Sequence, residues 1–202
     1  MDPAVMDPAQ KNTAGEVPRT VWEGKWLRMK QRGRWEYVER TNDRGLAVII
    51  IAATPAGKLL LVEQERVPVG RRTIEMPAGL VGDLEPGESV ELAAARELLE
   101  ETGWEASRVE VLMTGPTSSG MSNEEVVMVR ATGLRRVHAG GGDATEAIIV
   151  HEVAIDAVPA FLSARMADGY AVDPKLWAGL WLLERNADGS AAVAPAAGID
   201  AG

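Results

Sequence analysis

The sequence predicts an α+β fold, an α/β/α sandwich, and three observations lead to this expectation. Short segments rich in β-branched residues alternate along the chain with helical segments. The last two helical segments follow the strands and can cover their sheet. The chain has 202 residues, of which 46% are hydrophobic, so it is long enough for one large domain with a buried core.

The first strands are expected near the N-terminus. Val21–Met29 and Trp35–Arg40 are rich in Trp, Val and Tyr, and the turn between them, residues 31–34, predicts a hairpin. Leu46–Ala52 is a continuous apolar run and predicts a buried strand. After the turn at residues 55–57, Lys58–Glu65 predicts the next strand.

The clearest helix is expected over Glu88–Gly103, because Pro, Gly and Ser precede it and glycine ends it. Two closing helices are predicted over Asp156–Ala167 and Pro174–Arg185, each with an aspartate at its beginning as the N-cap. The further strands are predicted at Val109–Met113, Glu125–Ala131 and Ala147–Val153.

Composition divides the chain into four parts. Residues 1–18 are small and polar and predict a flexible leader, and residues 187–202, rich in Ala, Gly, Asp and Pro, predict a flexible tail. Residues 19–43 hold the N-terminal strands, and residues 44–186 hold the main domain.

Charge and residue usage exclude several functions. The net charge of -9 disfavours nucleic acid as a partner. With no cysteine, disulfides and thiol catalysis are excluded. No apolar run is long enough to span a bilayer and the first residues do not form a secretory signal, so we expect a cytoplasmic protein without a membrane partner.

The main helix carries an unusual group of carboxylates. Glu97, Glu100 and Glu101 lie three and four residues apart and therefore project to one side. Like charges at this spacing repel, and negative charge is disfavoured at the end of a helix. A solvated surface face is the common explanation, whereas a bound Mg²⁺ or Mn²⁺ would resolve the repulsion. The residues expected to pack on a sheet, on the opposite side, are Leu92, Ala95 and Leu99.

The segment from Gly82 to Trp104 resembles the Nudix box, G-x5-E-x7-R-E-U-x-E-E-x-G-U, where U is bulky and apolar. This resemblance implies the Nudix fold, with a mixed central sheet and an extra N-terminal antiparallel sheet. The fixed positions are filled by Gly82, Glu88, Arg96, Glu97, Leu98, Glu100, Glu101, Gly103 and Trp104.

The resemblance also implies functions for these residues. Glu97, Glu100 and Glu101 are similar to the metal ligands of the family, and Arg96 with Glu88 is similar to the pair that braces the loop. Glu100, Glu101 and Arg96 are thereby expected to be catalytic. The implied chemistry is attack on phosphorus by water that Mg²⁺, or Mn²⁺, activates.

The segment before the box, VEQERVPVGRRTIEMPAGLVG, resembles the branch of the family that hydrolyses ADP-ribose and nucleoside-diphosphate sugars. By that similarity Arg66 would contact a phosphate, Glu75 would help to hold the distal sugar or a nearby polar group, and the carbonyl of Ala78 would be a metal ligand. One departure is that Gly79, rather than Gly82, follows Pro-Ala, so residues 80–82 are an insertion.

The same branch supplies a catalytic glutamate from a loop after the box. Glu146 matches it as the general base, with Asp143 as the alternative. Residues 114–124 resemble a substrate loop, so Gly120 and Met121 are expected to bind substrate.

The N-terminal strands resemble those with which members of the branch form homodimers. Aromatic residues gather there and suit an interface, or a nucleobase could stack on one of them. The aromatic residues are Trp22, Trp26, Trp35 and Tyr37.

The predicted reaction is hydrolysis of ADP-ribose to AMP and ribose 5-phosphate. The alternatives are another nucleotide sugar, such as GDP-mannose or ADP-glucose, and a regulator that binds a nucleotide without cleaving it.

Overall fold

The structure is a computed structural model that describes residues 16–41, 45–82, 85, 87–142, 147–186 and 188–192. It divides into two compact units. The first contains the residues up to Leu46 together with Gly115–Val126, and the second contains Ala47–Thr114 and the residues from Val127 onward. Residues 1–15 of the predicted leader lie outside the described residues. In the predicted tail, residue 187 and residues 193–202 also lie outside them.

The first unit contains an antiparallel sheet of three strands, β1 (Arg19–Glu23), β2 (Leu27–Arg32) and β3 (Trp35–Arg40). The expectation of one strand over residues 21–29 was wrong, because the chain turns at Gly24. The Trp22 ring lies over Gly24 so closely that an added Cβ would be 2.4 Å from it. The Gly24 N–H donates to the Leu27 carbonyl at 2.8 Å, in the turn between β1 and β2.

The second unit contains two four-stranded sheets. One has the order β7-β4-β10-β9, with β4 at Leu46–Ala52, as predicted. The other has the order β12-β5-β6-β13 and is mixed, because β13 pairs with β6 in parallel while the remaining pairs are antiparallel. The bounds of the other strands are β5 Lys58–Arg66, β6 Arg71–Glu75, β7 Ala78–Leu80, β9 Arg108–Pro116, β10 Glu125–Thr132, β12 Ile149–Ala154 and β13 Ala171–Val172.

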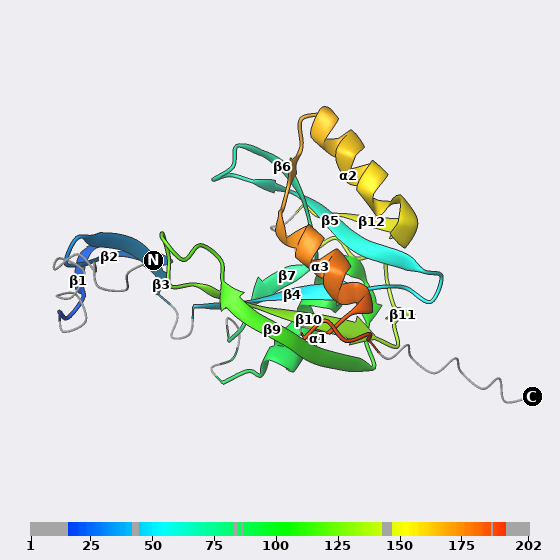
Figure 1. The fold of residues 1–202 in the computed structure, drawn as a ribbon, viewed down its shortest axis with the longest axis horizontal. Helices are drawn as coiled ribbons and strands as arrows, with labels where there is room; N and C mark the ends of the chain where they lie inside the picture. The colour runs from blue at the N-terminus through cyan, green and yellow to red at the C-terminus, as the bar shows by residue number, and fades with distance from the viewer. Residues whose placement is uncertain are drawn as a thin grey trace, which may run out of the picture. The chain divides into compact units, whose positions relative to one another are not determined.

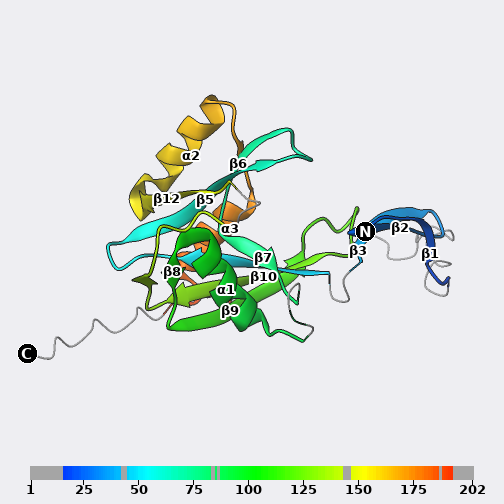
Figure 2. The same ribbon diagram turned by 180° about the vertical axis from the view of Figure 1, so that it is seen from behind.

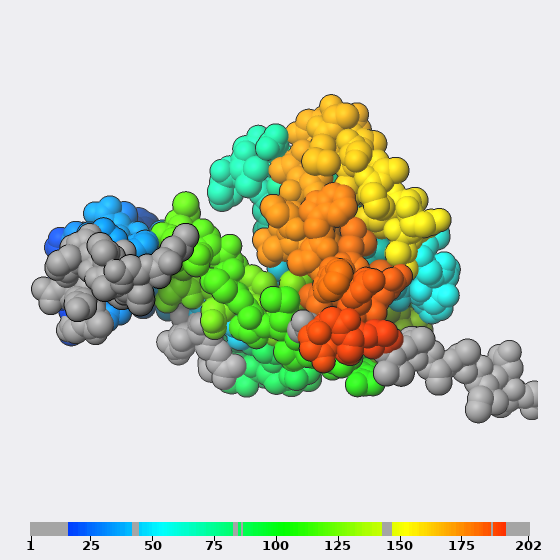
Figure 3. Space-filling model, in the orientation of Figure 1, coloured from blue at the N-terminus to red at the C-terminus, as the bar shows by residue number. Residues whose placement is uncertain are grey.

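Helices lie on both sides of these sheets. α3 (Lys175–Glu184) is in front of the sheets in Figure 1, and α1 (Val90–Thr102) is in front when the molecule is seen from behind in Figure 2. α2 (Val158–Ala167) packs beside β12 and β13, and with α3 it forms much of the face of this unit seen in Figure 3. The predicted α+β sandwich is confirmed. The short pair β8 (Trp104–Glu105) and β11 (Arg135–Arg136) completes the unit.

The second closing helix is held by two close contacts. Gly179 lies against Met76, since an added Cβ would be 2.1 Å from the Met76 Cε atom. At the other end, the Arg130 guanidinium of β10 donates to the carbonyl oxygens of Leu182 and Arg185, at 2.7 Å each. Positive charge at a helix C-terminus is stabilising, so Arg130 fixes the end of α3 to the sheet.

The predicted aspartate caps are only partly present. Asp156 lies in a 3-10 turn, Ile155–Ala157, and α2 begins after it without a side-chain cap. Asp173 does accept a hydrogen bond from the Lys175 N–H, at 2.8 Å. Among the described residues, no helix is long and apolar enough to cross a membrane.

Candidate functional site

Helix α1 begins and ends with recognisable caps. The Ser89 hydroxyl accepts a hydrogen bond from the Leu92 N–H at 3.2 Å, which satisfies one of the free donors at the helix start. At the other end Gly103 adopts the left-handed conformation, with φ 74°, and donates to the Leu99 carbonyl at 2.9 Å. These caps fix where the carboxylates in the last two turns lie.

The face of α1 that packs on the sheet differs from the predicted one. Ala93, Ala94 and Leu98 are fully buried, whereas Leu92 is 65% exposed. The expectation that Leu92 faces the sheet was therefore wrong, while Ala95 and Leu99, expected beside it, are half-buried. The small side chains of Ala93 and Ala94 allow their side of the helix to approach the protein interior.

Two of the predicted metal ligands contact consecutive residues of β7. Glu101 is 4% exposed, and its carboxylate accepts a hydrogen bond from the Ala78 N–H at 3.0 Å. Glu97 lies against Gly79, where an added Cβ would be 1.9 Å from the Glu97 Cδ atom. Burying a carboxylate is costly unless it is paired, and the hydrogen bond from Ala78 offsets part of this cost.

Arg96 connects the loop to the helix and forms what we call the helix cluster, Arg96 with Glu88, Glu97 and Glu100. Its guanidinium contacts the Glu88 carboxylate at 3.1 and 3.3 Å and Glu97 at 2.8 Å, with Glu100 at 3.4 Å. Glu88 in turn accepts from the Gly82 N–H at 3.1 Å. The expected contact between Glu88 and Arg96 is thus present, and it holds the loop at Gly82.

These contacts change the acidity of both partners. The Arg96 guanidinium lowers the pKa of Glu88 below its ordinary value. Burial by itself would lower the pKa of Arg96, but Glu88 and Glu97 outweigh this effect and raise the pKa. The cluster therefore contains permanent charges of both signs at neutral pH.

The helix carboxylates fit a hard divalent cation by their chemistry. They offer only oxygen donors, as Mg²⁺ and Mn²⁺ prefer, and Glu97 and Glu101 contact the same short strand. Within the described part of the chain, however, no three acidic or histidine side chains are gathered closely enough to hold an ion. Arg96 holds Glu97 and Glu100, while the Ala78 N–H holds Glu101, so a cation would have to compete with these partners.

A second group of charges lies on β5 and β6, and we call Arg66, Thr73 and Glu75 the hairpin cluster. The Arg66 guanidinium forms a fork on Glu75, at 2.8 and 2.7 Å, and the Thr73 hydroxyl donates to the same carboxylate. Burial by itself would raise the pKa of Glu75, but the hydrogen bonds from Arg66 and Thr73 lower it below its ordinary value. The structure therefore pairs the two substrate residues predicted at these positions with each other.

The described ends of the predicted base loop meet the end of α1. The Gly141 and Gly142 N–H groups donate to the carbonyls of Glu101 and Glu100, at 2.8 and 3.1 Å. Ile148 donates to the Gly141 carbonyl at 3.3 Å, so the two ends are close together. Glu146 and Asp143 themselves lie outside the described residues.

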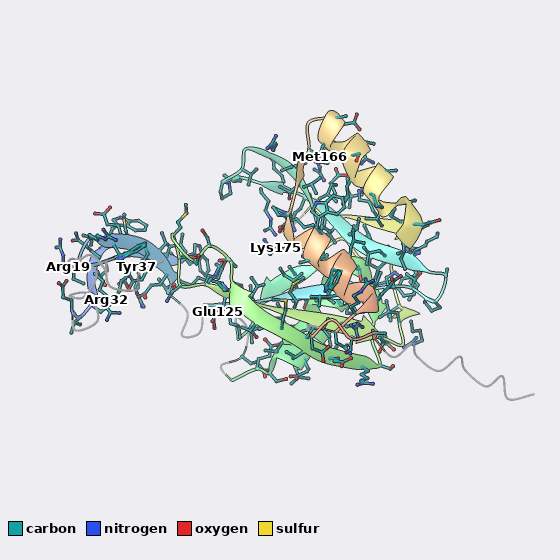
Figure 4. The ribbon with its side chains drawn as sticks, viewed as in Figure 1. Arg19, Arg32, Tyr37, Glu125, Met166 and Lys175 are labelled. Atoms are coloured by element: carbon teal, nitrogen blue, oxygen red, sulfur yellow. The ribbon has the colours of Figure 1, made fainter. Side chains whose placement is uncertain are left out.

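Gly120 and Met121 belong to the first unit, where they line a pocket of about 530 Å³. The other walls include Arg32, Trp35 and Tyr37 of the β2–β3 hairpin, and Figure 4 labels Arg32 and Tyr37 on this sheet. The Val38 N–H donates to the Met121 carbonyl at 2.8 Å, which attaches the loop to β3. The sequence had indicated the aromatic residues but not Arg32.

Sequence reasoning also missed the partners of His151. Its Nε2 atom lies 2.9 Å from Glu63, which also accepts a hydrogen bond from Arg72 at 2.5 Å. The His151 ring packs on Phe161, with ring centroids 5.2 Å apart. Glu63 is 88 positions away from His151 in the sequence, so no local pattern could indicate this pair. The placement of His151 on a strand was predicted.

The chain belongs to the Nudix family: a model of the NUDIX domain matches residues 43–159, more than half of its length. The family predicted from the box is therefore confirmed. The match begins beside the predicted domain start at residue 44 and ends in α2, while the predicted end at residue 186 stays a prediction.

Curated relatives match part of the chain. The methanol dehydrogenase activator of Bacillus methanolicus is 39% identical over 111 residues, which are 54% of this chain and 58% of that protein. The ADP-ribose pyrophosphatase of Mycobacterium tuberculosis is 46% identical over 91 residues, which are 45% of this chain and 43% of that protein. The chain thus spans about half the length of these relatives.

A solved structure supports the fold. The crystal structure of an ADP compounds hydrolase aligns with a TM-score of 0.56 and 20% sequence identity, covering 76% of this chain and 92% of that one. At this identity the likeness shows the fold alone, and it agrees with the mixed sheets and helices described above.

Proposed function

We propose that the protein hydrolyses the diphosphate bond of ADP-ribose, giving AMP and ribose 5-phosphate. Its membership of the Nudix family and its similarity to an ADP-ribose pyrophosphatase support this proposal. The observation that carries it is the position of Glu101, which is buried beside Ala78 and next to Glu97, because two carboxylates that contact one short strand place oxygen donors together for a divalent cation.

Nudix hydrolases use divalent metal ions, and we propose Mg²⁺ here, with Mn²⁺ as an alternative. Glu97, Glu100, Glu101 and the Ala78 carbonyl would hold the ion. When bound, it would neutralise the phosphates and increase the acidity of water near the phosphorus. Arg96 would compensate the charge of Glu97 and Glu100 and keep them in position through its contacts.

The phosphates of the substrate would be bound by the hairpin cluster. Arg66 can exchange the Glu75 carboxylate for a phosphate, because its planar fork matches both anions. Glu75 is then available to accept hydrogen bonds from sugar hydroxyls. Gly120 and Met121 stay predicted substrate residues, and within the first unit they share a pocket with the aromatic side chains of Trp35 and Tyr37.

The general base would come from the loop whose first end, at Gly141 and Gly142, is hydrogen-bonded to α1. Gly142 is hydrogen-bonded to the Glu100 carbonyl, so the chain enters this loop beside the proposed ligands. We assign Glu146 as the base that accepts a proton from water, with Asp143 as the alternative. Glu146→Gln with unchanged turnover would transfer this assignment to Asp143.

A substrate panel tests the proposal. ADP-ribose, GDP-mannose, ADP-glucose and a nucleoside triphosphate would be incubated with and without Mg²⁺, and phosphate measured after a phosphatase has cleaved the products. We expect turnover of ADP-ribose that a chelator abolishes. Faster turnover of GDP-mannose or ADP-glucose would make that nucleotide sugar the substrate in place of ADP-ribose. Binding of ADP-ribose without turnover would favour a regulator.

We also propose a cytoplasmic homodimer formed through the N-terminal strands. Trp22, Trp26 and Trp35 of this region are 60%, 63% and 48% exposed, and aromatic residues are enriched at interfaces. Light scattering after gel filtration is expected to give twice the chain mass of 21.6 kDa. A monomer at all concentrations would contradict the dimer but would leave the proposed reaction unaffected.

A further inference from the structure

The beginning of α3 lies beside the hairpin cluster because of the parallel pairing of β13 with β6. Ala171 is opposite Thr73, and Val172 is opposite Ile74. The Asp173 N–H then donates to the Ile74 carbonyl at 3.0 Å, which continues the pairing. The chain therefore passes Glu75, the next residue of β6, immediately before α3 begins.

Lys175 is the first residue of α3, and Figure 4 labels it there. Asp173 holds it twice, because one carboxylate oxygen accepts from the Lys175 N–H at 2.8 Å and the other lies 2.7 Å from Nζ. Burial by itself would raise the pKa of Glu75, and the hydrogen bonds from Arg66 and Thr73 lower it. The positive charge of Lys175 also lowers it. Lys175 and Arg66 thus act on the same carboxylate.

Exposure separates the cations of this group from its acids. The side chains of Arg66 and Lys175 are 43% and 42% exposed, whereas those of Glu75 and Asp173 are 10% and 18% exposed. A dissolved anion can therefore reach the two cations more easily than the two carboxylates. The two carboxylates hold Arg66 and Lys175 in position, and the N–H donors of these cations are accessible to water and solutes.

We propose that Lys175 is a substrate-binding residue that binds the diphosphate of the nucleotide together with Arg66. This inference rests on the proposed function and extends it to α3, which the sequence had assigned only to covering the fold. An arginine fork and a lysine point charge can bind two phosphates of a diphosphate at once. A second cation favours substrates with two linked phosphates over monophosphates.

The test compares Lys175→Ala and Lys175→Arg with the control Lys58→Ala. Lys58 is a matched control, because its side chain is 45% exposed and also lies near a carboxylate, Glu152, at 3.9 Å. Two quantities would be measured for each: kcat and KM with ADP-ribose, and the Kd of its α,β-methylene analogue by calorimetry without divalent metal. Thermal unfolding would report whether each variant is folded.

We expect Lys175→Ala to raise both KM and Kd by roughly tenfold, with kcat within about twofold of wild type. Lys175→Arg should recover most of the affinity, and Lys58→Ala should change neither constant. An unchanged Kd in folded Lys175→Ala overturns the inference, and so does an equal loss in Lys175→Arg. If wild type binds the analogue but turns over no nucleotide, the proposed function fails while the binding comparison still decides the assignment of Lys175.

Discussion

The helix cluster and the hairpin cluster use the same two side-chain types in different proportions. In the helix cluster one guanidinium is shared among three carboxylates, those of Glu88, Glu97 and Glu100. In the hairpin cluster one guanidinium forms a complete fork on one carboxylate, that of Glu75. The first group retains excess negative charge, while the second is balanced and presents its arginine to solvent.

This difference indicates which kind of ligand each cluster can accept. Excess carboxylate attracts a cation, whereas an exposed guanidinium can accept a phosphate in place of a carboxylate. A hydrolase for a diphosphate needs both. The predictions below test the two assignments separately, beginning with the largest expected effect.

Removing the charge of Glu101 should have the largest effect. Glu101→Gln keeps a side-chain oxygen for the Ala78 N–H but loses a proposed metal ligand, so we expect kcat to fall by roughly 10³-fold with little change in folding. Initial rates at saturating Mg²⁺ measure this. The matched control is Glu91→Gln, an exposed glutamate in the first turn of α1, which should retain wild-type turnover. Retained turnover in Glu101→Gln would refute the metal assignment.

Gly79→Ala tests whether the position of Glu97 matters. The added methyl group would displace the Glu97 side chain from β7, because the three atoms nearest to it all belong to that side chain. A ligand misplaced by about 1 Å can cost roughly 10²-fold in rate, so we expect a fall in kcat of this order. Thermal unfolding should remain close to wild type. Full activity would mean that Glu97 functions equally well away from Gly79.

Arg66→Ala tests the hairpin cluster. The loss should appear mainly in KM, with an increase of roughly tenfold or more, because a charged contact to phosphate is removed. It should also lower the free energy of unfolding by about 1–3 kcal/mol, since Glu75 keeps its burial but loses its main partner.

The double variant Arg66→Ala/Glu75→Gln distinguishes the two effects. It should recover stability in urea unfolding, because no buried charge is left without its guanidinium, while KM stays high. Recovery of KM together with stability would show that Arg66 acts only by holding Glu75.

The smallest effect is expected on the stability of the fold at acid pH. It concerns Glu63 and Arg72, a second pair in the same hairpin. Burial by itself would raise the pKa of Glu63, but His151 and Arg72 lower it below its ordinary value. Because the folded pKa is depressed, the stabilisation is complete above the ordinary glutamate pKa of about 4.3 and is lost as the pH falls through the folded value. Urea unfolding between neutral and acid pH should show a weaker loss for Glu63→Gln than for wild type.

Local patterns in the sequence predicted the long elements well. The strand Leu46–Ala52 has the predicted bounds, and α1 begins and ends within two residues of its predicted ends. The strands β6, β7 and β13 were not predicted, because they have five residues or fewer, and β7 and β13 exist only through pairing with distant partners.

The sequence indicated which residues could form the candidate site, but it did not give their arrangement in space. The spacing of Glu88 and Arg96 indicated their contact, which the structure contains. The orientation of α1 was predicted wrongly at Leu92, since helix periodicity cannot tell whether a carboxylate face meets water or a strand such as β7. The functions of Glu97, Glu100 and Glu101 stay predictions until the variants are measured.

The contact of Gly179 with Met76 has a consequence for engineering the protein. Met76 is 3% exposed and directly precedes the Pro77-Ala78 segment, whose Ala78 N–H holds Glu101. A methyl group at residue 179 would press on Met76 from the opposite side of the sheet and could move this segment. Substitutions on the outer helix can therefore alter turnover without touching any residue that contacts substrate, and a screen for faster or slower variants should include α3.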